Sequence, residues 1–143
     1  MKINAQNIHK ATYINMMSQQ DSESTFEEFL KSGAQLVRQT EPNTAFWFAL
    51  KDDNHLCIFD IFFNEKGREQ HFAGKVANAL KENASHLVRG GWEQGVLHNV
   101  CNYDVVSSND FNKDSVLTAK EASYISFKAS PVSCQNRRVS VCH

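Results

Sequence analysis

The chain has 143 residues, of which 41% are hydrophobic and 22% are charged, and its formal net charge is -1. This length predicts a single domain, and the balanced charge offers no basic surface for nucleic acid. No apolar run approaches the roughly 20 residues of a membrane helix, and the first ten residues lack the apolar segment of a secretory signal. We therefore expect a cytoplasmic protein with neither a nucleic-acid nor a membrane partner.

The first part of the chain predicts a strand followed by a helix. Residues 11–18 (ATYINMMS) contain neither glycine nor proline, and this composition indicates a strand. A capping box, either Ser24 with Glu27 or the same pairing one residue later, marks the start of the helix. Pro42 ends the helix, because the residue before a proline is pushed out of the α region. The apolar stripe of this helix, which runs to about residue 39, consists of Phe26, Phe29, Leu30, Gly33 and Val37.

The middle of the chain, residues 44–63 (TAFWFALKDDNHLCIFDIFF), predicts two strands around a polar turn. Asn64 can cap a second helix, which the glycines at 90 and 91 end. The apolar stripe of this helix consists of Phe72, Val76, Ala79, Leu80 and Leu87. A last strand is predicted over residues 96–106. The resulting order is the ferredoxin-like split β-α-β pattern, an α+β fold with an antiparallel sheet.

The predicted domain therefore covers residues 1–106, and the composition changes at residue 107. The polar stretch SSNDFNKDS opens a C-terminal extension over residues 107–143. This extension is an added edge element, a segment exchanged with a partner subunit, or a tail. The four cysteines, at positions 57, 101, 134 and 142, form no CxxC pair, so we expect no metal site.

The predicted hairpin is apolar on both faces except for one acid, Asp60. With a turn of two or four residues, one face holds Ala45, Trp47, Ala49, Leu56, Ile58, Asp60 and Phe62. The opposite face then holds Phe46, Phe48, Leu50, Cys57, Phe59, Ile61 and Phe63. We expect the helices to cover this second face, because it is apolar without interruption. A turn of three residues would instead exchange the partners across the hairpin.

The face that carries Trp47 would then stay uncovered by helices. Exposing its large side chains to water would forgo roughly 1.5 to 3 kcal/mol for each one. We therefore expect a homodimer in which this face packs against a second copy of the chain. Asp60 must be hydrogen-bonded there or have a raised pKa, because an isolated buried charge is costly. It either faces a cavity or bonds a group such as the backbone or Arg68 and fixes the register.

The segment from Glu41 to Leu80 (EPNTAFWFALKDDNHLCIFDIFFNEKGREQHFAGKVANAL) resembles the central part of the antibiotic biosynthesis monooxygenase family, within the dimeric α+β barrel superfamily. In that family an E-P-G-T segment enters the hairpin, an F-D-x-F-like strand follows, and a helix begins near a histidine. The likeness covers about residues 11–106. It implies a homodimeric barrel in which each subunit encloses a small pocket between its sheet and its helices. It also implies oxidation of a small quinol-like aromatic by O2 without a metal, flavin or other cofactor.

The resemblance and the residue chemistry together suggest four site residues. His71 matches the family's histidine and is the candidate catalytic proton acceptor, kept neutral by a helix N-terminus. Trp47 would stack on a planar substrate, Asn15 would bond a substrate oxygen, and Asp60 would line the cavity. Each also has a structural interpretation: His71 as a boundary residue, Trp47 as core, and Asn15 as an amide bonded to the backbone.

Two alternative functions remain at this stage. One is a non-catalytic dimeric module that binds a small apolar ligand. The other is haem binding or degradation, because a neighbouring branch of the superfamily uses an asparagine, a tryptophan and a histidine, comparable to Asn15, Trp47 and His71. In that branch the histidine lies in a motif resembling N-W-x-A-H, whereas this chain has GREQH, so the haem hypothesis ranks last.

Overall fold

The computed structural model of the chain describes residues 7–109. Its main elements are β1 (Lys10–Met17), α1 (Glu23–Thr40), β2 (Thr44–Asp52), β3 (His55–Phe62), α2 (Glu65–Phe72), α3 (Lys75–Leu87) and β4 (Val100–Asp104). Two short turns precede β4, the π-helical η2 (Gly91–Val96) and the 3-10 turn η3 (Leu97–Asn99). The predicted extension, apart from residues 107–109, lies outside the described residues.

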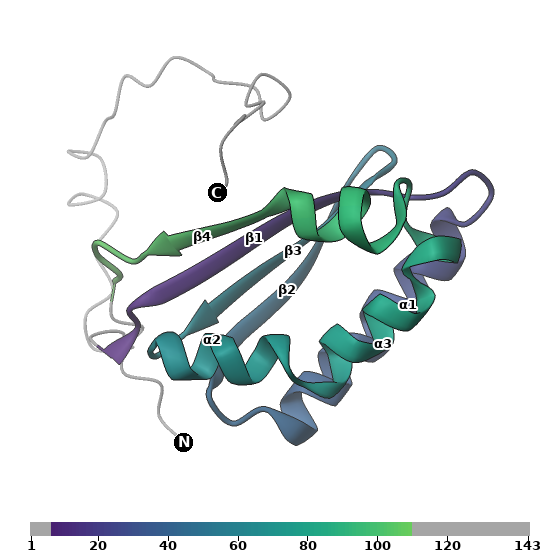
Figure 1. The fold of residues 1–143 in the computed structure, drawn as a ribbon. Coiled ribbons are helices and arrows are strands. Elements are labelled where there is room, and N and C mark those ends of the chain that lie inside the picture. The colour runs from purple at the N-terminus through teal and green to yellow at the C-terminus, as the bar shows by residue number, and fades with distance from the viewer. Residues whose placement is uncertain (1–6, 110–143) are drawn as a thin grey trace, which may run out of the picture.

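The four strands form one sheet in the order β2-β3-β1-β4, and all neighbouring strands are antiparallel. Helices α1 and α3 pack against each other and cover one face of this sheet, while α2 lies across its end (Figure 1). The arrangement confirms the predicted α+β, ferredoxin-like fold. No helix within residues 7–109 is long and apolar enough to cross a membrane.

The hairpin turns over two residues, Asp53 and Asn54, because Asp52 pairs with His55. Asp53 has a positive φ of 51°, as the tight turns of two-residue hairpins require. In this register Trp47 lies opposite Asp60. The predicted division of the hairpin into two faces is therefore correct from Phe46 onward, including the placement of Trp47 and Asp60 on the same face. An irregularity between Thr44 and Phe46 leaves Ala45 outside the paired register, so its predicted place on the Trp47 face is not confirmed.

The prediction of which face the helices cover is wrong. Leu56, Ile58 and Phe62 belong to the buried core under the helices. On the opposite face, Phe48 and Leu50 keep 44% and 47% of their surface exposed. The stripe of α1 explains the choice, because Gly33 leaves room for the indole: a Cβ added there would lie 3.3 Å from Cη2 of Trp47. The alternation of side chains along a strand divides the hairpin residues between two faces. It does not determine which of these faces packs against the apolar side of α1.

The helix boundaries follow local signals in part. The side chain of Asn64 accepts a hydrogen bond of 2.9 Å from the N–H of Gly67 and caps α2 as predicted. The predicted capping box of α1 is wrong, because Ser22 is its N-cap and makes no side-chain cap bond. The predicted second helix is two helices, since the chain breaks at Ala73 and restarts after Gly74.

The end of α3 and the last strand also differ from the prediction in length. Helix α3 ends at Leu87 with Val88 as an extended C-cap, three residues before the predicted break at Gly90. Gly90 and Gly91, with φ values of 88° and 66°, form the left-handed turn that leads into η2. The chain then makes the two turns η2 and η3 before it enters the sheet. Strand β4 is therefore shorter than the predicted strand over residues 96–106.

Candidate functional site

Three ionisable side chains from distant parts of the chain meet beside α2. The Nδ1 atom of His71 lies 2.5 Å from Oε1 of Glu41, and its Nε2 atom lies 3.0 Å from Oδ2 of Asp60. The side chains of His71, Glu41 and Asp60 are 6%, 9% and 0% exposed. We call this group the carboxylate–histidine triad. A buried imidazole with a carboxylate on each ring nitrogen is a strongly charged arrangement inside an apolar core.

Each member of the triad is held by its own element. Glu41 is the C-cap of α1, and its backbone N–H bonds the carbonyl of Val37 at 2.9 Å. Its Oε1 also lies 3.3 Å from the hydroxyl of Thr44, which donates to it. Asp60 projects from β3 toward the helices, on the same face as Trp47. The Glu41-Pro42 junction therefore places the Glu41 carboxylate where the chain passes from α1 to β2.

Helix α2 presents His71 to both carboxylates. Its start is fixed by the Asn64 cap, and His71 lies about two helical turns later, on the side that faces the core. Arg68 holds the helix in place, because its guanidinium donates to the carbonyls of Ala11 and Tyr103 at 2.8 and 2.9 Å. The ring of Phe62 packs 5.4 Å from the imidazole.

The two carboxylates determine the charge of His71. Burial by itself lowers the pKa of His71, but the contacts with Asp60 and Glu41 outweigh it and raise the pKa to about 9. Burial raises the pKa of Asp60, while the contact with His71 opposes the rise. The expected neutral histidine at a helix N-terminus is therefore wrong. His71 lies in the last turn of α2, where the helix dipole also favours a cation.

Several buried polar atoms at the triad lack a hydrogen-bond partner. Within residues 7–109 these atoms include Oε2 of Glu41, Oδ1 of Asp60 and Nε1 of Trp47. The contact between Asp60 and Nε2 of His71 is an ion pair at 3.0 Å, but it lacks the alignment of a hydrogen bond. Arg68 pairs with Glu65 at 2.9 Å, so it is not the partner of Asp60 that the sequence suggested.

A cavity of about 320 Å³ opens beside the triad. Glu41 and His71 form part of its wall, and Asp60 lies behind them, outside the lining. The remaining lining comes from Thr40, Pro42, Asn43, Thr44, Gly67, Gln70, Gly74 and Lys75. A Cβ on Gly67 would lie only 2.8 Å from the carbonyl oxygen of Asn43, so only glycine lets α2 approach this loop so closely. The cavity therefore has the size for a small molecule and a charged wall on one side.

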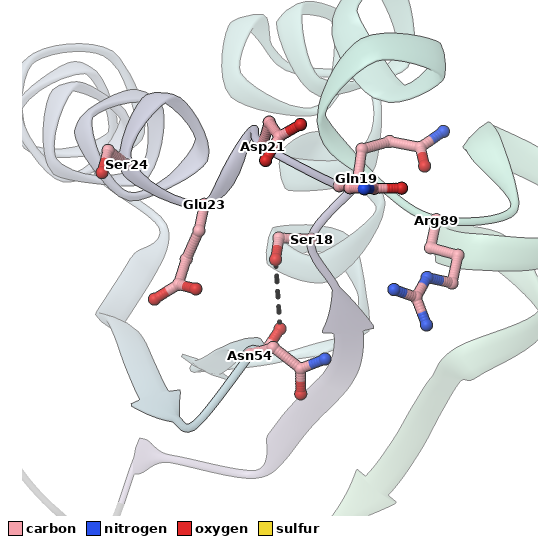
Figure 2. A pocket seen from close by; sticks show the side chains of 8 residues that line it. Ser18, Gln19, Asp21, Glu23, Ser24, Asn54 and Arg89 are labelled. Atoms are coloured by element: carbon pink, nitrogen blue, oxygen red, sulfur yellow. Dashed lines mark hydrogen bonds between the residues drawn. The ribbon is translucent and has the colours of Figure 1, made fainter.

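A second cavity, also of about 320 Å³, lies near the other end of β1. Figure 2 shows Glu23 and Arg89 on opposite sides of it, with the hydroxyl of Ser18 bonded to the carbonyl oxygen of Asn54 at 3.4 Å. Its charged side chains Asp21 and Arg89 belong to exposed residues. Solvated charges of this kind are ordinary surface, so we place the candidate site at the triad.

Comparisons with known proteins identify the fold. No family model matches the chain, and no curated protein matches it. A protein of unknown function from Nitrosomonas europaea has a TM-score of 0.64 and 27% identity, over 71% of this chain and 93% of that one. A "putative antibiotic biosynthesis monooxygenase" from Deinococcus radiodurans has a TM-score of 0.59 and 14% identity, over 72% and 98%. One from Chloroflexus aurantiacus reaches 0.55 and 8%, over 73% and 99%.

The chain has an antibiotic biosynthesis monooxygenase-like fold. The resemblance seen in the sequence between Glu41 and Leu80 therefore predicted the architecture correctly. The triad and its cavity both lie within this architecture.

The structure brings together three of the four predicted site residues. His71 and Asp60 touch, and Trp47 lies on the same face of the sheet, opposite Asp60 and against α1. Asn15 lies on the other face, where its Oδ1 is 2.9 Å from Nδ1 of His55. Neither Trp47 nor Asn15 lines the cavity beside the triad.

Sequence reasoning missed the role of Glu41. Glu41 is the first residue of the segment that resembles E-P-G-T, but no neighbouring residue in the sequence indicates a function for it. It lies 30 positions before His71 in the chain, and their contact depends on how α1, β2 and α2 pack. Asp60 and His71 were each proposed as site residues, and a buried acid near a histidine would have justified a search for a second carboxylate.

Proposed function

We propose that the protein is a cofactor-independent monooxygenase that oxidises a small quinol-like aromatic with O2. The observation that carries this proposal is the buried carboxylate–histidine triad in the wall of a cavity of about 320 Å³. The monooxygenase-like fold supports the reaction class, and the cavity volume suits a single aromatic ring with small substituents.

In this reaction the protein has two tasks, which are to accept a proton from the substrate and to shield the resulting anion from water. A phenol or hydroquinone that loses a proton becomes electron-rich enough to pass an electron to O2. The site must therefore bind the ring, receive the proton and stabilise the anion in a dry environment. His71, with a pKa of about 9, holds its own proton at neutral pH and contributes positive charge near the developing anion.

We also propose that the protein is a homodimer, formed through the sheet face opposite the helices. Phe46 and Phe48 stack there with ring centroids 5.9 Å apart, and Phe48 and Phe59 stack at 6.4 Å. Phe48 and Leu50 are nearly half exposed in the single chain. Covering the remaining surface of each such side chain contributes roughly 0.7 to 1.5 kcal/mol, so a second copy of the same face would stabilise the assembly. The partner face is thus the reverse of the one first expected.

The direct test is O2 uptake with a panel of hydroquinones. We expect uptake with at least one of them, and a loss of about 100-fold in His71→Ala, the scale of a lost group that stabilises the charge of the transition state. His86→Ala, at an exposed histidine of α3, is the matched control and should keep full activity. If no hydroquinone supports uptake while hydroquinones still bind, the protein is a non-catalytic binding module.

One observation argues against haem degradation. Asn15 lies on the opposite face of the sheet from His71, so the asparagine, tryptophan and histidine do not surround one pocket. Addition of haem should accordingly give no absorption band that depends on His71.

A further inference from the structure

When both carboxylates are ionised, the triad contains more negative charge than its histidine can balance. One imidazolium faces two carboxylates, at 2.5 Å for Glu41 and 3.0 Å for Asp60. When either carboxylate takes a proton, the imidazolium still keeps the other as a counter-ion. The triad can therefore accept one proton without leaving a buried charge unpaired.

The two carboxylates differ in their access to the cavity. Asp60 is fully buried and lies outside the lining, whereas Glu41 forms part of the wall. One oxygen of Glu41 already accepts bonds from His71 and Thr44. The other, Oε2, is enclosed and has no hydrogen-bond partner among residues 7–109. A hydroxyl group of a bound molecule would supply the missing bond to this oxygen once the side chains around it move to admit the molecule.

The ring nitrogens of His71 are not available for the same task. Nδ1 is held by Glu41 and Nε2 by Asp60, so neither can accept a proton from a molecule in the cavity. His71 is better described as a positioning residue, because it orients Glu41 and fixes the charge balance of the triad.

Another part of the wall carries positive charge. Lys75 lines the cavity and forms no ion pair within residues 7–109. It is also the first residue of α3, which has no acidic residue in its first turn and no side-chain cap. The free backbone N–H groups of that turn add to the positive potential near the cavity. The cavity wall thus contains both a proton acceptor and an anion-stabilising group.

We propose that Glu41 is the catalytic base and that the site takes a small molecule with an acidic hydroxyl group, whose anion Lys75 stabilises. This inference rests on the proposed oxidation of a quinol-like aromatic and names the group that ionises it. In the step, the O–H bond of the ligand breaks and a new O–H bond forms on Oε2 of Glu41. The electron pair stays on the ligand oxygen, so nothing is oxidised or reduced until O2 takes an electron from the anion.

The proton transfer can be tested without any turnover. A nitrophenol is a suitable probe, because it absorbs visible light only as the phenolate. At a pH below the pKa of the free probe, the wild-type protein should bind it as the anion. Calorimetry in two buffers of different ionisation enthalpy should show no net proton release, because the proton stays on the protein.

Three variants separate the roles. Glu41→Gln keeps an acceptor for His71 but cannot take the proton, so the band of the bound anion should fall about tenfold or more. Lys75→Met, at an exposed position, should weaken the same band without affecting folding. Glu69→Gln, at an exposed acid of α2, is the control and should behave as the wild type.

The outcomes distinguish this inference from the proposed function. An anion band that survives in Glu41→Gln but disappears in Asp60→Asn would overturn the assignment of the base. A wild-type protein that binds the nitrophenol only in its neutral form would overturn it as well. If the bound anion depends on Glu41 but no hydroquinone supports O2 uptake, the base assignment stands and the monooxygenase proposal fails. If uptake occurs and is unchanged in Glu41→Gln, the monooxygenase proposal stands and the base assignment fails.

Discussion

The charge of His71 makes the stability of this protein depend on pH in a defined direction. The folded protein holds the His71 proton up to a pKa of about 9, against 6.5 for an ordinary histidine. Between these two values the folded state binds more protons than the unfolded state, so stability falls as the pH rises. The contribution of His71 is fully present below pH 6.5 and is lost as the pH passes 9.

The size of the effect follows from the same two values. Each unit of pKa difference corresponds to about 1.4 kcal/mol, so the shift from 6.5 to about 9 amounts to about 3 kcal/mol. The side chain is 6% exposed, so solvent screening reduces this figure little. A single domain has a total stability of about 5 to 15 kcal/mol, and a loss of this size is readily measured.

The assay is urea unfolding at several pH values from about 6 to about 10, for the wild type and for His71→Gln. The wild type should lose about 3 kcal/mol more than the variant over this range. His86→Gln, which changes an exposed histidine, should follow the wild type. Asp60→Asn should shrink the effect, because His71 then keeps one carboxylate instead of two. Parallel curves for the wild type and His71→Gln would show that His71 is not held as a cation.

Three further predictions concern the fold and the assembly. Asn64→Ala should lower the free energy of unfolding by about 1 kcal/mol in urea, whereas Ser22→Ala should cost less because Ser22 makes no side-chain cap bond. Gly67→Ala should cost about 1 to 3 kcal/mol, measured in the same way, because its Cβ meets backbone at 2.8 Å; an unchanged stability would contradict this close approach. Phe48→Lys should convert a dimer to a monomer in light scattering, while Gln35→Glu on the outer surface of α1 should not; a dimer that survives in Phe48→Lys would exclude this face.

Much of the fold could be predicted from the sequence because its signals are local. Two apolar runs around a polar turn in residues 44–63 predicted the hairpin, and the alternation of side chains between its two faces placed Trp47 and Asp60 on one face. Asn64 predicted the start of α2, and the glycines at 90 and 91 marked the end of α3 to within three residues. Each of these signals lies within a few residues of the feature that it determines. The resemblance from Glu41 to Leu80 then joined the elements into the correct architecture.

The tertiary structure alone decided which face the helices cover and what surrounds His71. Both hairpin faces are apolar, so the choice depended on the fit between Trp47 and Gly33, which lie on different elements. The approach of Glu41 to His71 likewise comes from packing between distant segments. The raised pKa of His71 results from that packing, because the pKa of an imidazole depends on the charges around it and on its burial. The residues next to His71 in the sequence determine neither of these.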